Sequence, residues 1–94
     1  MATVHASYGK ARAIDGVSIW QGTGRTETIT SSGTAASGAL TANGNEIVKV
    51  SCATAIIVSA DGASASSSHG TYVDAGIPEY FALGDGFAIS VIDA

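Results

Sequence analysis

The side chains best suited to metal binding in this 94-residue chain are two histidines, one cysteine and eight acidic residues. His5 and His69 stand far apart in the sequence, and Cys52 stands alone between them. No spacing among these residues matches a known ligand pattern. The sequence therefore predicts no metal site, and it gives no sign of another cofactor.

Ser68, His69 and Asp74 supply the residue types of a hydrolytic triad. A working triad also needs a base oriented by a buried acid, together with an oxyanion hole. The chain has no G-x-S-x-G turn of the kind that exposes a nucleophilic serine, and serines are abundant around His69. We interpret these residues as solvated loop residues and expect no enzymatic activity.

Other polar residues have a sufficient structural explanation. Asp15, Asp61 and Asp85 each precede a glycine; carboxylates can bind calcium or transfer protons, but Asp-Gly pairs also satisfy turn geometry. Gly22-Thr23-Gly24 begins like a phosphate-binding loop but lacks the helix and the Lys-Ser/Thr that should follow. Cys52 alternates with two valines on one strand face, which predicts a buried, unreactive thiol.

Length and charge narrow the class of protein. A chain of 94 residues fits a single domain, residues 1–94. The net charge is −4 and the few lysines and arginines are scattered, so nucleic-acid binding has little electrostatic support. There is no long apolar run to form a transmembrane helix and no apolar signal core at the N-terminus. We expect no membrane partner and synthesis in a cytoplasm.

The elements that must position these residues are strands. Isoleucine, valine and threonine outnumber leucine, and twelve glycines disfavour helices. Short stretches alternate between apolar and polar residues, and Gly-rich turns separate them. The pattern predicts an all-β domain, an antiparallel β-sandwich or a jelly-roll-like barrel. Strands are expected at Thr3–Tyr8, on either side of Asp15-Gly16, at Arg25–Thr30, Glu46–Cys52, Ala55–Val58 and Thr71–Asp74.

Two hairpins are predicted in detail. Asp15-Gly16 is a two-residue turn that sets Ile14 opposite Val17, with short arms that end at Trp20 before a loop. At the other end of the chain, Glu79–Leu83 and Phe87–Ile92 alternate around Gly84-Asp85-Gly86. A three-residue loop there would place both apolar sets on one face, so we predict that these two strands pair.

Two segments carry weaker signals. Ser31–Ala42 consists of small and polar residues and fits either a flexible linker or a weak, extended strand. Ala63–Gly70 has no large apolar side chain, so we expect an exposed, mobile loop.

The C-terminal quarter resembles small virion proteins of tailed bacteriophages. The run from Gly76 to Phe81, GIPEYF, and the run from Leu83 to Ile92, LGDGFAISVI, are similar to the pattern with which those sequences often end. Gly33–Ser37 also looks like that group. At the position after Asp85 the family often has a charged or polar residue, and this chain has Gly86-Phe87 instead.

The resemblance implies a non-enzymatic role, as a decoration or cement protein on a capsid surface, made in the host cytoplasm. In such proteins β-sandwich subunits form homo-oligomers, commonly trimers, that clamp the major capsid protein. From expected exposure we name as candidate partner contacts Thr3, Val4, His5, Trp20, Tyr72 and Tyr80. The N-terminal segment Thr3–Tyr8, which contains the first three of these residues, is the segment expected to reach a neighbouring subunit.

A virion surface-binding module, such as a fibre tip or a carbohydrate-binding domain, is the alternative. Trp20, Tyr72 and Tyr80 could then form a sugar-binding platform, although a chain with few large residues needs at least two of them in a core or an interface. Ala63–Gly70 would be part of the recognition surface.

Overall fold

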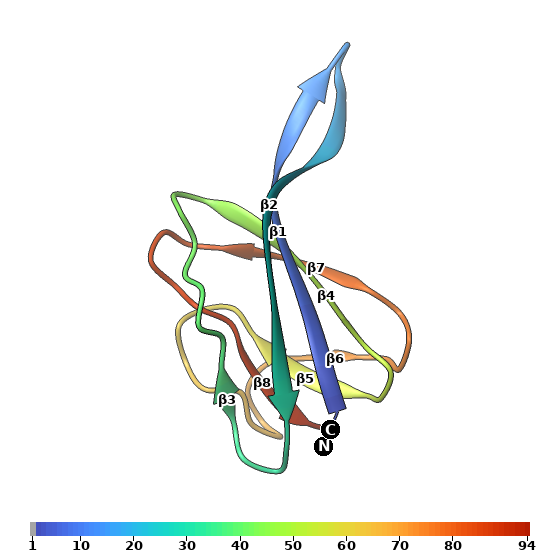
Figure 1. The fold of residues 1–94 in the computed structure, drawn as a ribbon, viewed down its shortest axis with the longest axis vertical. Helices are drawn as coiled ribbons and strands as arrows, with labels where there is room; N and C mark the ends of the chain where they lie inside the picture. Colours follow the sequence, from blue (N-terminus) through green and yellow to red (C-terminus); the bar gives the residue numbers. More distant parts are fainter. Residues whose placement is uncertain (1) are drawn as a thin grey trace.

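Two four-stranded antiparallel sheets pack face to face in the computed structural model, which describes residues 2–94 (Figure 1). The first sheet has the order β2 (Val17–Ser31), β1 (Ala2–Ile14), β4 (Glu46–Cys52), β7 (Glu79–Leu83). The second has the order β3 (Ala36–Ser37), β8 (Ser90–Asp93), β5 (Ile56–Ser59), β6 (Thr71–Val73). The prediction of an all-β fold is confirmed, in its β-sandwich form.

The core lies between the sheets and follows the alternation of the strands. Val4, Ala6 and Tyr8 of β1 and every second residue of β4 are buried, and these side chains meet the buried residues of β5 and β8. The face predicted for Glu46–Cys52 is confirmed, including the buried Cys52. β5 differs from the expectation of a strand buried on both sides, because Ile57 is only half-buried between the buried Ile56 and Val58.

The first hairpin has the predicted turn but much longer arms. Asp15 and Gly16 both have positive φ, 50° and 80°, and Ile14 pairs with Val17 as expected. β2 then continues through the predicted loop at Gln21–Gly24, because the ladder absorbs extra residues there instead of ending. Tyr8 faces the three residues Thr23–Arg25, and Gly24 takes a φ of 77° inside this bulge.

The predicted pairing of the last two strands is wrong. β7 pairs with β4 in the first sheet, whereas β8 pairs with β5 and β3 in the second. The turn itself exists, since the N–H of Phe87 donates to the carbonyl of Gly84 at 3.0 Å. The turn carries the chain from one sheet to the other, so Leu83 and Val91 reach the core from opposite sides. Phe87 stays largely exposed.

Small residues hold the two segments with weak signals in place. In residues 31–42, Gly38 and Ala42 donate backbone hydrogen bonds to Ile89 and Phe87, so the segment runs along the edge of the second sheet as an extended connection. In residues 63–70, Ala65 is buried and its N–H donates to Ser90 Oγ at 3.0 Å. Most of residues 63–70 are exposed, as predicted, but the buried Ala65 attaches the segment to β8.

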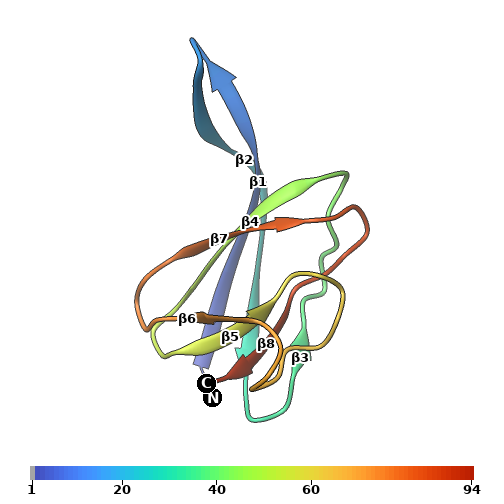
Figure 2. The ribbon, with the colours of Figure 1, turned by 180° about the vertical axis from the view of Figure 1, so that it is seen from behind.

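The β1–β2 hairpin extends beyond the rest of the molecule at one end (Figures 1 and 2). It makes the molecule long and narrow, with extents of 43 × 26 × 23 Å. The hairpin projects from the end of the first sheet at which β1 stops pairing with β4. Both ends of the described chain lie at the opposite end of the molecule (Figure 2).

Candidate functional site

The projecting part of the hairpin, Lys10–Gln21, is called the arm below. β1 pairs with β4 only as far as Gly9, which lies opposite Ile47. Beyond that point, within residues 2–94, β1 pairs only with β2, so the arm is a ribbon of two strands with two open edges. An isolated two-stranded hairpin is only marginally stable in water, so a contact made on the arm would stabilise it.

One face of the arm is apolar towards its tip. Residues opposite one another in an antiparallel pair share a face, which places Ile14, Val17 and Ile19 together, with Arg12 beside them. These three apolar side chains are 50%, 60% and 47% exposed. We call this the apolar face of the arm.

The apolar face continues the side of β1 that builds the core. Val4 and Tyr8 point from β1 towards the second sheet and are buried, and the same alternation continues through Lys10 and Arg12 to Ile14. The second sheet ends before the arm begins (Figure 1). The side of β1 that faces the core in the body of the molecule is therefore exposed in the arm, where the second sheet no longer covers it.

Trp20 anchors the opposite face of the arm to the first sheet. Its indole lies over Gly9, where an added Cβ would come within 2.7 Å of Trp20 Cζ2 and 2.5 Å of the carbonyl oxygen of Gln21. The indole also meets the Tyr80 ring of β7 edge to face, at a centroid distance of 5.4 Å. Two of the predicted partner contacts thus pack on each other, although Tyr80 remains 54% exposed.

A buried carboxylate organises the root of the arm. Glu46 is buried and accepts hydrogen bonds from the N–H of Asn43 at 2.6 Å, from Thr23 Oγ1 at 3.3 Å and from Arg25. Burial alone raises the pKa of the Glu46 carboxyl, but the hydrogen bonds from Asn43 and Arg25 and the charge of Arg25 outweigh it. The net pKa lies below the ordinary value, so Glu46 is ionised and paired with Arg25.

Tyr8 and Glu27 extend this network across the hairpin. The Tyr8 hydroxyl donates to Glu27 Oε2 at 2.6 Å, and the N–H of Ala39 donates to Glu27 Oε1 at 2.7 Å. Burial, followed by the bond to Glu27 and its charge, raises the pKa of Tyr8 well above the ordinary value. The Arg25 guanidinium lies 5.0 Å from the centre of the Tyr8 ring. β1, β2 and the segment before β4 are thereby joined where the arm leaves the body.

The sequence analysis did not single out this network. The strand predicted at Arg25–Thr30 is part of β2, at the edge of the first sheet, but no role was predicted for Arg25 or Glu27. The available signal was their spacing, because both lie on the same face as the buried Ile29. Charged residues that share a face with a core residue need partners.

The Ser-rich segment holds a contact between His69 and Asp61 rather than a triad. His69 Nε2 lies 2.9 Å from Asp61 Oδ2, and the Ser59 hydroxyl donates to Asp61 Oδ1 at 2.8 Å. The bond from His69, followed by that from Ser59, holds the pKa of Asp61 well below its ordinary value. Ser68 contacts Ser66, and among residues 2–94 no hydrogen bond joins His69 to Ser68 or Asp74.

The other predicted contacts lie on separate surfaces. Thr3 and His5 are exposed on the outer face of the first sheet and line a hollow of about 580 Å³ near Gly76. Val4 is 0% exposed, so its prediction as a partner contact is wrong: the alternation of β1 turns its side chain into the core. Tyr72 is 58% exposed on the outer face of the second sheet, away from Trp20 and Tyr80.

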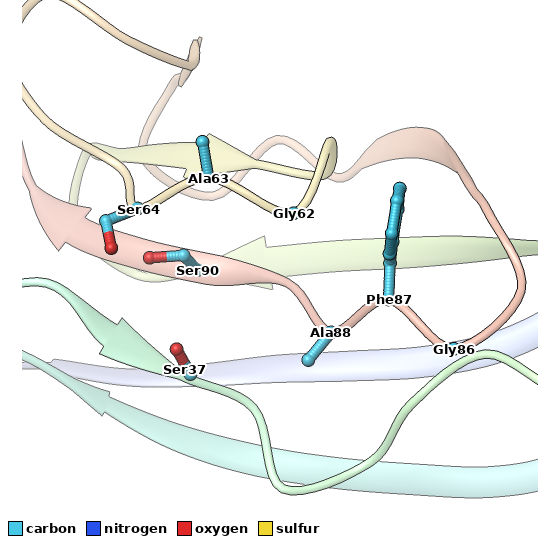
Figure 3. A pocket seen from close by; sticks show the side chains of 8 residues that line it. All are labelled: Ser37, Gly62, Ala63, Ser64, Gly86, Phe87, Ala88 and Ser90. Atoms are coloured by element: carbon cyan, nitrogen blue, oxygen red, sulfur yellow. The ribbon is translucent and has the colours of Figure 1, made fainter.

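A smaller hollow of about 210 Å³ lies beside β8 (Figure 3). Phe87 forms one wall of it, and the Ser90 hydroxyl in it already accepts the Ala65 N–H. No charged side chain lines it, so it offers little to orient a ligand. The lining residues are Ser37, Gly62, Ala63, Ser64, Gly86, Phe87, Ala88 and Ser90.

Within residues 2–94 no group of three or more His, Cys, Asp or Glu side chains is placed to hold a metal ion. The same residues include no helix that is long and apolar enough to cross a membrane. Comparison of the chain with protein-family models, with curated proteins and with solved structures found no match.

Proposed function

We propose that this protein is a bacteriophage structural protein that decorates or cements a capsid surface through oligomeric contacts, with the arm as its main contact element. The observation that carries the proposal is the exposure of Ile14, Val17 and Ile19 on a ribbon that projects beyond the body. Clustered apolar side chains on a surface mark sites of association between proteins. The resemblance of the C-terminal quarter to phage virion proteins is the reason for proposing a capsid as the surface that the protein binds.

The chemistry of the arm suits assembly. Its apolar face offers area to bury, and its two open edges offer unpaired backbone groups to a strand of another subunit, which is the mode of β-strand addition. The hydrogen bonds of Glu46 and Glu27 fix the direction in which the arm leaves the body. A preorganised contact element binds more tightly because less motion is lost on binding.

Co-sedimentation tests the proposal. The purified protein is mixed with shells of the major capsid protein encoded in the same genome, and the bound fraction is measured. Wild-type protein should bind, and a variant with Ile14→Ser and Val17→Ser should bind at least about tenfold more weakly, because two apolar contacts are lost. Thr28→Ser, a change on the exposed face of β2 in the body, is the control. Absence of wild-type binding contradicts the capsid assignment.

A virion surface-binding module is the second candidate, and the exposure of Tyr72 and Tyr80 favours it. Exposed aromatic rings can stack on sugars. Binding to a glycan array that is lost in Tyr72→Ala or Trp20→Ala, together with no affinity for capsid shells, would select this candidate.

A further inference from the structure

We infer that the arm of one copy of this chain docks on the outer face of the second sheet of another copy. This inference rests on the proposed function, in which the arm is the contact element, and adds the identity of its partner. Three observations carry it: an apolar row on the second sheet, a difference in charge between the two surfaces, and the direction in which the arm projects.

The apolar row crosses the second sheet from β6 to β8. Ile57 lies opposite Tyr72 on one side and Ile92 on the other, so the three side chains share a face. Ile56 and Val58 point into the core, which turns Ile57 and its two neighbours outward. Tyr72 is exposed, and Ile57 and Ile92 are half-buried. The row matches the apolar face of the arm in kind and in number of large side chains.

The two surfaces differ in charge. Lys10, Arg12 and Asp15 give the arm a net charge of +1. Asp74 is exposed two residues after Tyr72, at the edge of the receiving face, and residues 53–78, which contain β5 and β6, hold no lysine or arginine. Charges of opposite sign steer two surfaces together and disfavour wrong partners, including a second, equally positive arm.

The direction of the arm excludes its own second sheet as the partner. The alternation of β1 puts the apolar face on the same side as the buried Val4 and Tyr8, which is the side that the second sheet covers. The arm continues beyond the end of that sheet (Figures 1 and 2). The Glu46 and Glu27 hydrogen bonds hold the root in this position. A second copy can supply the missing cover, and it carries the same arm and the same receiving face.

One arm is a small contact, so the exchange must be reciprocal. The arm has twelve residues, fewer than the roughly 20–30 residues that each side of a stable interface contributes. If two copies exchange arms about a two-fold axis, each copy contributes two contact surfaces and the assembly closes as a dimer.

Cysteine cross-linking between two variants tests the contact. Val17→Cys and Tyr72→Cys proteins, one carrying a mass tag, are mixed and treated with a short bismaleimide. Cross-linked heterodimers should form in the mixture well above the level of either variant alone. Wild-type protein measures the background from Cys52, which is buried. Tyr80→Cys is the matched control on the first sheet, because Tyr80 is nearly as exposed as Tyr72, at 54% against 58%.

The outcomes separate this inference from the proposed function. Cross-linking of Val17→Cys with itself, or with Tyr80→Cys as efficiently as with Tyr72→Cys, would overturn the assignment of the receiving face. A wild-type protein that stays monomeric in light scattering but still binds capsid shells would overturn the inference and leave the proposed function standing. A protein that self-associates through Tyr72 but has no affinity for capsid shells would overturn the proposed function and leave the docking of the arm standing.

A charge exchange provides a second test that needs no cross-linker. Arg12→Glu and Asp74→Arg should each weaken self-association by about threefold to tenfold at low salt, and the double variant should recover part of the loss. Lys49→Glu changes a cation on the outer face of the first sheet and should have no effect. Equal losses in Arg12→Glu and Lys49→Glu, which both make the net charge of −4 more negative, would point to net charge alone and would contradict a contact between these surfaces.

Discussion

Trp20 and Tyr80 meet edge to face, with ring centroids 5.4 Å apart and ring planes at 66°. The contact joins β2 at the root of the arm to β7 at the far edge of the same sheet, across β1 and β4. It is a long-range clamp on an element that otherwise has only its own hairpin partner. The direction of the arm therefore depends on this aromatic pair as well as on the polar network of Glu46.

Replacement of Tyr80 by alanine should loosen the arm more than the body. The loss of an edge-to-face pair costs about 0.5–1.5 kcal/mol beyond the lost burial. Amide hydrogen exchange should accelerate in residues 10–21 and change little in β5. Ile77→Ala is the control, because it removes another large exposed side chain, at 52%, that lies outside both the arm and the proposed receiving face. Equal acceleration in both variants would contradict the clamp.

Gly9 should not accept a side chain. A Cβ at this position would lie 2.5 Å from the carbonyl oxygen of Gln21 and 2.7 Å from the Trp20 ring, so backbone must move. We expect Gly9→Ala to lower the free energy of unfolding by about 1–3 kcal/mol. Gly33→Ala is the matched control, since an added Cβ there meets nothing within 4 Å. Denaturant unfolding measures both variants, and the same small change in each would show that the close approach of Trp20 is absent in solution.

Glu46 should make the fold sensitive to acid. Its pKa is lowered in the folded state, so its contribution to stability is present above the ordinary value of 4.5 and is lost as the pH falls through the folded pKa. Glu46→Gln should cost about 2–4 kcal/mol at pH 7, because Arg25 loses its anionic partner and retains the carbonyl of Thr41.

The pH profile of this variant separates charge from packing. The melting temperature of Glu46→Gln should change less than that of wild type between pH 7 and about pH 3. The remaining slope should include Asp61, whose pKa is also lowered. Glu79→Gln, on an exposed position of β7, is the control. A Glu46→Gln profile parallel to that of wild type would contradict an ionised, paired Glu46.

Tyr8 should make the fold sensitive to alkali. Its pKa is raised in the folded state, so the stability that it contributes is present below the ordinary value of 10.0 and is lost as the pH rises towards the folded pKa. Tyr8→Phe should cost about 1.5–3 kcal/mol at pH 7, because the hydroxyl bonded to Glu27 is lost. Denaturant unfolding from pH 8 to pH 11 should then give a flatter profile than wild type. If the free energy of unfolding of Tyr8→Phe falls with pH as steeply as that of wild type, the loss of stability in alkali comes from a group other than Tyr8.

The sequence was sufficient for local features. The alternation in Glu46–Cys52 gave that strand its bounds and its buried face, and Asp15-Gly16 gave the turn and its register. These features depend on neighbours in the chain, because side-chain period and turn geometry are local properties. The same reasoning correctly placed His5 on the outward side of β1.

Features that depend on distant partners were missed. Alternation in Glu79–Leu83 and Phe87–Ile92 specifies which side chains face the core, but two facing sheets satisfy it as well as one hairpin does. The length of β2 was underestimated because Gly22 and Gly24 suggested a loop, whereas β1 keeps the ladder together across the bulge. The pairing of Asp61 with His69 depends on the fold of the whole segment between them, which its small and polar residue types do not specify.

The crossing of the chain after β7 affects the order of folding. β8 lies inside its sheet, between β3 and β5, although it is the last of the eight strands in the chain. During synthesis β3 has no strand neighbour, and β5 has only β6, until residues 90–93 have left the ribosome. This pairing order predicts that the second sheet closes late in synthesis. Ribosome-stalled chains that end at Ala88 should accordingly stay protease-sensitive, whereas chains with a linker after Ala94 should become resistant.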